Sequence, residues 1–175
     1  MNRNLILLLA AGALGVILLS LAMNQNSFLG MAPSTPVDTQ SQAESADAKQ
    51  AKAMMARALE YMDEHGTAAL IEKINAAAPE FHYGEYYVFI MDNTATIVAH
   101  PINPAWIGIG DDTGRDADGN PFFAQMVAAA AENPDGTWFD YRWPNPVTGE
   151  VAIKSSWVVM RDDHLIGVGI YLEEE

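Results

Sequence analysis

Residues 136–171 read "GTWFDYRWPNPVTGEVAIKSSWVVMRDDHLIGVGIY" and decide the expected fold. Three segments rich in aromatic and β-branched residues, 136–143, 151–160 and 164–171, are separated by the turn-forming stretches "PNPVTGE" and "RDD". Connections this short favour antiparallel pairing of consecutive strands. This part of the chain is therefore expected to supply three strands of one antiparallel sheet.

Two more strands and three helices are expected upstream of that stretch. Segments 86–91 and 95–100 flank the hairpin signal Asp92-Asn93-Thr94. Helices are expected at 42–65, at 68–78 after an N-cap at Thr67, and at 121–133 with Asn120 as N-cap and Pro121 as first helical residue. The whole is an α+β domain built on one five-stranded antiparallel sheet, with a loop and a helix crossing over between the second and third strands.

The first 23 residues (1–23) predict a membrane segment. Arg3 precedes an apolar run at 5–23, which as a helix extends about 28 Å at ~1.5 Å per residue and nearly matches a bilayer core. A cleaved signal peptide is the alternative, and both place the rest of the chain outside the cytoplasm. Residues 24–41 have the composition of a flexible linker. We therefore expect one domain, 42–175, in the periplasm and anchored to the cytoplasmic membrane.

Charge excludes one class of partner. The net charge is −14, and all 23 acidic residues lie at or after Asp38. Such a chain repels phosphate backbones, so nucleic acid is not an expected partner. An anionic ligand must meet a local positive site that overcomes the field of the whole protein.

Five residues in the strands are candidates for a binding site on pattern alone. Alternation places Phe139, Tyr141 and Trp143 on one face of their strand, where they form either core or a pocket wall. Lys154 lies among apolar strand positions, where a lysine either reaches solvent or serves an anion. His100 ends the second strand, where it either satisfies a nearby polar group or contacts a ligand.

Metal binding and catalysis find little support in the sequence. The acidic stretch "GDDTGRDADGN" suggests an EF-hand, but placing Gly119 at the sixth position puts Gly114 first and Gln125 twelfth, without the required carboxylates. Ser155 and Ser156 lie in a strand without a nucleophile elbow, and the chain has no cysteine. We expect neither an enzyme nor a bound cofactor. The acidic loop is expected to be a solvated loop before a helix N-terminus, with a looser metal site at 111–118 as the alternative.

The order of several motifs identifies a resemblance. An aromatic strand is followed by "AHP", "NPxxIG", "DADGxPFF", "YxWPNPxTGE", "KSSW" and "GVGIY". Over about 45–172 this series resembles the extracytoplasmic single Cache domain, a small-molecule sensor module of bacterial chemoreceptors and histidine kinases. The resemblance implies a PAS-like five-stranded antiparallel sheet, with the long N-terminal helix on one face and a loop-and-helix lid over the other.

The resemblance also implies a ligand and a set of ligand-binding positions. Ligands of the family are typically small carboxylates such as acetate, propionate, lactate or pyruvate. The matching pocket positions in this sequence are Tyr87, His100, Trp106, Tyr141, Trp143 and Lys154. A histidine that titrates near neutral pH would make binding sensitive to pH. Tyr86, Ala95 and Trp157 stand where the family often has Gly, Gly and Tyr, which leaves the ligand's identity open.

Two functions remain in competition at this stage. The first is a membrane-tethered module that binds or senses a short-chain carboxylate. It is expected to signal through a separate partner or a dimer mate, because the chain ends at "YLEEE" where sensors of the family usually continue into a second membrane helix and a signalling module. The second is an accessory domain that binds no ligand and docks onto a membrane receptor or enzyme.

Overall fold

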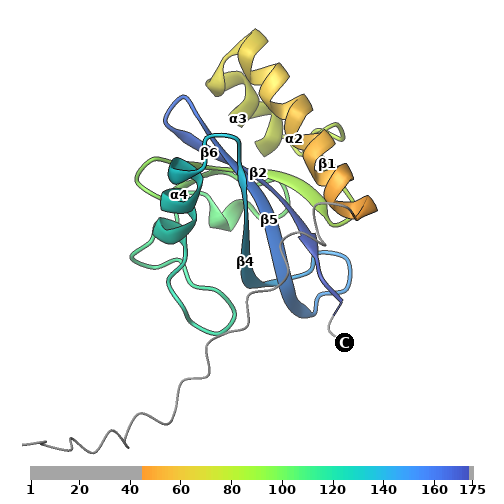
Figure 1. The fold of residues 1–175 in the computed structure, drawn as a ribbon, viewed down its shortest axis with the longest axis vertical. Coiled ribbons are helices and arrows are strands. Elements are labelled where there is room, and N and C mark those ends of the chain that lie inside the picture. Colours follow the sequence, from red (N-terminus) through yellow and green to blue (C-terminus); the bar gives the residue numbers. More distant parts are fainter. Residues whose placement is uncertain (1–44, 174–175) are drawn as a thin grey trace, which may run out of the picture. The chain divides into compact units, whose positions relative to one another are not determined.

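A computed structural model describes residues 45–173, which form an α+β domain with helices on both sides of one sheet (Figure 1). The expected membrane segment at 1–23 and the linker at 24–41 lie outside the described residues. Within the described residues, no helix is both long and apolar enough to span a bilayer. The expected fold class is confirmed, since the domain combines three α-helices with an antiparallel sheet.

Two helices precede the sheet. Helix α2 (Ala46–His65) begins later than the expected residue 42, because the Ser45 hydroxyl caps it by accepting the Ala48 N–H at 3.0 Å. Gly66, with φ 85°, ends α2 and is also the N-cap of α3 (Thr67–Asn75). The expectation that Thr67 is the N-cap is therefore wrong, since one glycine serves both helix ends. The buried residues of α2 are small or flexible: Ala48, Ala51, Met54, Met55, Ala58 and Met62.

All five expected strands are present, and one short strand is added. The strands are β1 (His82–Tyr83), β2 (Tyr86–Asp92), β3 (Ile97–Ala99), β4 (Thr137–Pro144), β5 (Val151–Arg161) and β6 (His164–Tyr171). Their order is β1-β2-β6-β5-β4, with β3 also paired to β2, and every pairing is antiparallel. The extra strand β1 has two residues, too few for an alternating pattern to be visible in the sequence.

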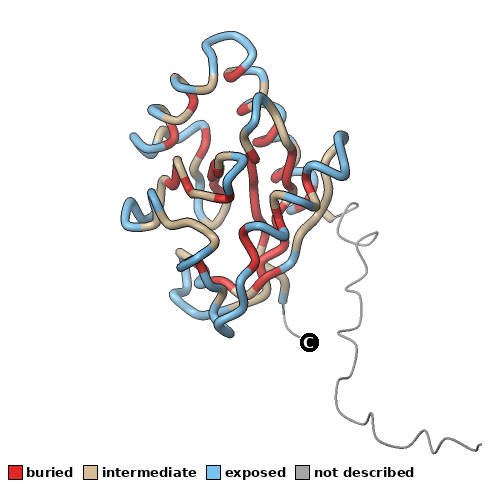
Figure 2. The backbone as a smooth tube through the Cα atoms, turned by 90° about the vertical axis from the view of Figure 1, so that its left-hand side faces the viewer, coloured by how far each residue is buried: buried red, intermediate tan, exposed pale blue. Residues whose placement is uncertain are grey.

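The sheet has two different faces, and each has its own core. On the helix face, which α2 and α3 cover, the buried strand residues are mainly aliphatic, including Val88, Ile90 and Val168. On the lid face, which the segment between β3 and β4 covers, aromatic residues dominate. Figure 2 shows that buried backbone runs through the middle of the sheet while the surrounding loops are exposed. The alternation predicted for Phe139, Tyr141 and Trp143 is confirmed, since Tyr141 and Trp143 belong to the lid-face core and the partly buried Phe139 packs against it.

The lid consists of residues 100–136 and contains the short 3₁₀ helix η1 (Pro104–Trp106) and helix α4 (Phe123–Glu132). The Asn103 side chain caps η1 by accepting the Ala105 N–H at 3.0 Å. The expected start of α4 at Asn120 and Pro121 is wrong. Phe122 is the N-cap instead and has non-helical backbone angles, φ −141° and ψ −14°, while its side chain is buried in the lid-face core.

Candidate functional site

A small cavity lies between the lid and the sheet. It measures about 10 Å³, roughly the space of one water. We call it the inner pocket. It is lined by Tyr87, Phe89, Met91, Ile97, His100, Phe122, Phe123, Tyr141 and Trp143. Because any carboxylate is larger than a water molecule, a ligand could enter only if a lining side chain moved.

Lys154 is fully buried on β5, beside the inner pocket. Its Nζ lies 3.7 Å from the centre of the Tyr87 ring, a cation–π distance. Its Nζ has no hydrogen-bond partner within residues 45–173. Burial holds the pKa of Lys154 well below its usual value, and the negative charge of Glu85 partly opposes this shift. The sequence left open whether Lys154 reaches solvent or serves an anion. Because the side chain is fully buried, the first alternative is wrong.

A glycine on the neighbouring strand gives Lys154 its space. A Cβ atom on Gly169 would overlap the Cε atom of Lys154, and a Cβ atom on Gly167 would overlap the Phe89 ring. Both glycines lie on β6 and face the lid. The "GVG" of the sequence therefore makes room for two large side chains at the pocket.

His100 follows β3 and is 5% exposed. The Asn75 side chain, at the end of α3, accepts the His100 N–H at 3.0 Å. His100 Nδ1 accepts the Asn103 N–H at 3.2 Å, so in the neutral ring the proton is on Nε2. Burial, and then the charge of Lys154, lower the pKa of His100 to about 3. The expectation that its charge changes near neutral pH is therefore wrong for the ligand-free pocket.

Aromatic rings form the remaining walls of the site. Phe122 stacks on Tyr141 with ring centres 4.6 Å apart, and Trp106 in the lid contacts Trp143 at 4.6 Å. The Tyr141 hydroxyl is hydrogen-bonded to the Ser156 hydroxyl at 3.1 Å. Burial raises the pKa of Tyr141 well above its usual value, so the phenol keeps its proton.

The six positions implied by the resemblance lie together. Tyr87, His100, Tyr141 and Trp143 line the inner pocket. Trp106 covers Trp143, and the Lys154 Nζ lies over the Tyr87 ring. An ammonium, an imidazole N–H and phenol hydroxyls around an apolar space are donors suited to one carboxylate group.

Sequence reasoning missed several residues of the site. Phe122 and Phe123 line the pocket, and the "PFF" of the quoted motif was the signal that could have found them. Phe89 lies on the lid face two residues after Tyr87, as strand alternation requires. By contrast, Tyr86 and Trp157, two of the positions that depart from the family pattern, pack on the helix face and do not line the inner pocket.

The acidic loop is held by hydrogen bonds within the lid. Asp116 Oδ1 accepts the N–H groups of Asp118 and Asn120 at 3.0 and 2.8 Å. Asp111 Oδ1 accepts the Ala124 N–H at 2.9 Å, which satisfies a free donor at the start of α4. Within residues 45–173, no group of three or more His, Asp or Glu side chains is arranged to hold a metal ion.

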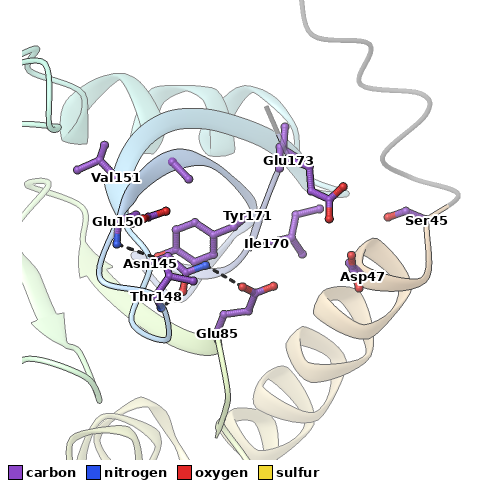
Figure 3. Close-up of a pocket in the computed structure, with 12 residues that line it drawn as sticks. Ser45, Asp47, Glu85, Asn145, Thr148, Glu150, Val151, Ile170, Tyr171 and Glu173 are labelled. Carbon is purple, nitrogen blue, oxygen red and sulfur yellow. Dashed lines mark hydrogen bonds between the residues drawn. The ribbon is translucent and has the colours of Figure 1, made fainter. Parts of the chain in front are cut away.

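A second and larger cavity opens at the end of the sheet where β6 finishes, beside the start of α2 (Figure 3). We call it the acidic cleft. It measures about 740 Å³ and has four carboxylate side chains among its lining residues, Asp47, Glu85, Glu150 and Glu173. Asp47 accepts the Tyr86 hydroxyl at 2.7 Å, and Glu85 accepts the Asn145 side-chain N–H at 2.9 Å. Acidic side chains make this cleft a poor place for an anion.

The sequence matches a family model over most of its length. The model for "Single Cache domain 2" matches residues 35–174. The chain belongs to the single Cache family. Its described part is therefore a Cache sensor domain, and the expected resemblance is confirmed.

Two curated relatives of this Cache domain are signalling proteins. The sensor histidine kinase MctS of Rhizobium johnstonii is 29% identical over 106 residues, which are 59% of this chain and 23% of that protein. The methyl-accepting chemotaxis protein McpP of Pseudomonas putida is 32% identical over 90 residues, which are 50% of this chain and 16% of that protein. The aligned segments thus span less than a quarter of either relative.

Solved structures support the fold. A methyl-accepting chemotaxis protein of Vibrio parahaemolyticus superposes with a TM-score of 0.61 and 22% identity, covering 77% of this chain and 95% of that one. A Cache chemosensory domain described for carboxylic acid recognition gives a TM-score of 0.57 with the same identity and coverage. The Cache fold is thus shared with chemosensory domains.

Proposed function

We propose that this Cache domain binds a short-chain monocarboxylate in the inner pocket and acts as an extracytoplasmic sensing module. The observation that carries the proposal is Lys154, a fully buried side chain whose Nζ has no hydrogen-bond partner within residues 45–173. A buried cation without a partner costs stability. A ligand carboxylate would supply the missing acceptor, and the neutral His100 would offer it an Nε2–H donor.

The composition of the pocket favours one carboxylate and a short apolar tail. Lys154 is the cation that approaches the rings of the pocket, and Phe89, Met91 and Ile97 offer apolar surface. A second carboxylate would be buried among these side chains without a matching charge. Recognition of a carboxylic acid by a domain of the same fold, in the related Cache chemosensory structure, agrees with this choice.

Tethering is the second part of the proposal. The apolar run at 5–23 behind Arg3 supports an N-terminal anchor that holds the domain outside the cytoplasm. Extraction of membranes with alkaline carbonate tests this anchor. The full chain is expected to stay in the membrane pellet, and release into the supernatant would contradict an uncleaved anchor.

Thermal unfolding of the full chain with a ligand panel tests binding. Acetate, propionate, lactate and pyruvate are compared with the uncharged, similarly shaped amides acetamide and propionamide. At 100 times its Kd, a ligand that binds the folded state adds about 2.7 kcal/mol to the free energy of unfolding. At least one acid should raise the melting temperature while its amide does not. Equal shifts with acid and amide, or no shift with any acid, would overturn the proposal.

A further inference from the structure

Phe122 fills the inner pocket. Its side chain is 5% exposed and packs between three other rings. The ring centres lie 4.6 Å from Tyr141, 5.8 Å from Trp143 and 4.6 Å from Phe123. With Phe122 in place the cavity is only about 10 Å³. The ring therefore occupies space beside Tyr141 and Trp143 that a ligand in this pocket would need.

Phe122 lies outside any helix or strand, unlike the other Phe, Tyr and Trp residues that line the pocket. Tyr87, Tyr141 and Trp143 are on strands, where a shift breaks sheet hydrogen bonds. Phe122 lies in the lid, directly before α4, and makes no side-chain cap there. A change in a few backbone angles of the lid would withdraw its ring and leave the sheet intact.

The sequence before α4 offers a second backbone arrangement. Asn120 and Pro121 form a good N-cap and first helical residue, yet both lie outside the helix because Phe122 has non-helical angles. If the ring left the pocket, α4 could extend back to Pro121 with Asn120 as its cap. Gly119, with φ 85°, lies just before this segment and could accommodate the change.

We propose that Phe122 is the size-determining gate of the inner pocket. Its ring leaves when a monocarboxylate binds, and the space that it can vacate sets the longest tail that the pocket accepts. This inference rests on the proposed function, since it concerns the same ligand class and the same site. It predicts that a smaller residue at position 122 shifts preference toward longer acids.

Phe122→Ala tests the gate, and Phe139→Ala is its matched control. Phe139 packs against the same core with its ring centre 6.4 Å from that of Tyr141, but it does not line the inner pocket. Calorimetric titration of the full chain gives Kd for propionate and pentanoate. Because one methylene in an apolar pocket changes affinity by about 10-fold or more, Phe122→Ala should raise the relative affinity for pentanoate at least about tenfold. Phe139→Ala should leave the ratio within about twofold of wild type.

The outcomes separate the gate from the proposed function. If Phe122→Ala binds propionate but keeps the wild-type ratio, the gate is wrong and carboxylate binding stands. If the wild-type chain binds no acid, the proposed function fails and the gate fails with it. Should Phe122→Ala not fold, Phe122→Leu removes less volume, and it should shift the ratio in the same direction. An unchanged ratio in Phe122→Leu would then overturn the gate.

Discussion

The inner pocket and the acidic cleft differ in volume and in charge, and the two properties point to different places for a ligand. The cleft measures about 740 Å³ and includes four carboxylate side chains, whereas the pocket measures about 10 Å³ and adjoins the buried Lys154. On a chain with net charge −14, an anion gains little from space alone. Our proposal therefore places the anion at an unsatisfied buried donor and not in the larger open volume. Five predictions test this proposal.

Lys154→Met should have the largest effect. It keeps a similar shape and removes the cation, so propionate binding should weaken by about 100-fold or more, as for other buried charge pairs that lose one partner. The melting temperature of the free chain should not fall, because a buried unpaired amine is replaced by an apolar group. Lys52→Met is the matched control, since Lys52 lies over Trp157 on the helix face. Equal affinity of wild type and Lys154→Met would move the anion out of the pocket.

Gly169→Ala should have the next largest effect on affinity. The new Cβ atom would displace the Lys154 side chain, whereas the same change at Gly167 would displace Phe89. Both variants should lose about 1–3 kcal/mol of stability through overpacking. Calorimetry should find a loss of about tenfold in propionate affinity at Gly169→Ala and a smaller one at Gly167→Ala. If the two variants bind equally, the placement of Lys154 does not control binding.

The pH dependence of binding should follow the protonation of the Lys154 amine. The carboxylate pairs with the ammonium form, so binding takes up a proton once pH exceeds the lowered pKa of Lys154. Affinity should therefore fall as pH rises above that value, by at most about tenfold per unit. Titrations across pH in wild type and Lys154→Met check this. The prediction is lost if wild-type affinity stays constant up to pH 10.

Without ligand, the free energy of unfolding should depend on pH in the opposite direction to binding above the folded pKa of Lys154. Lys154 has a lowered pKa in the folded state, so the unfolded chain holds that proton more tightly and stability rises with pH from the folded pKa toward 10.5. His100 has a folded pKa of about 3 against 6.5, so its contribution is lost as pH falls from about 6.5 to about 3. Chemical denaturation across pH checks both signs. Lys154→Met should flatten the rise in the free energy of unfolding toward pH 10.5, and His100→Phe should flatten its fall between about pH 6.5 and about 3.

Neutralising the cleft should have the smallest effect. Glu150 is exposed at the cleft, and Glu150→Gln should raise propionate affinity by less than about threefold at low salt. The gain should vanish at about 1 M salt, where the Debye length is only about 3 Å. A large change, or a loss of binding, would show that the cleft itself holds the ligand.

The strands and their faces could be predicted because strand alternation is local. Segment 164–171 matched β6 residue for residue, and the aromatic side of β4 was assigned correctly. The burial of Lys154 could not be predicted from its neighbours along the chain, because Gly169 on another strand provides the space for its side chain. The start of α4 was misplaced because burial of Phe122 overrides the helix-start signal at Asn120 and Pro121.

The charge state of His100 also could not be predicted from the residues next to it in the sequence. The loop after His100 is ordered by the Asn103 side chain, which caps η1 by accepting the Ala105 N–H. The pKa of His100 is lowered by burial and by the charge of Lys154, which lies 54 residues later in the sequence. The identity of these partners came from the family resemblance, since periodicity alone places no two distant strands side by side.

A crystal structure of the full chain grown with propionate tests the central claim most directly. We predict a carboxylate within hydrogen-bond distance of Lys154 Nζ and His100 Nε2, with the Phe122 ring withdrawn from its place against Tyr141. Propionate bound in the acidic cleft, with the inner pocket closed and Lys154 still without an acceptor, would contradict the account.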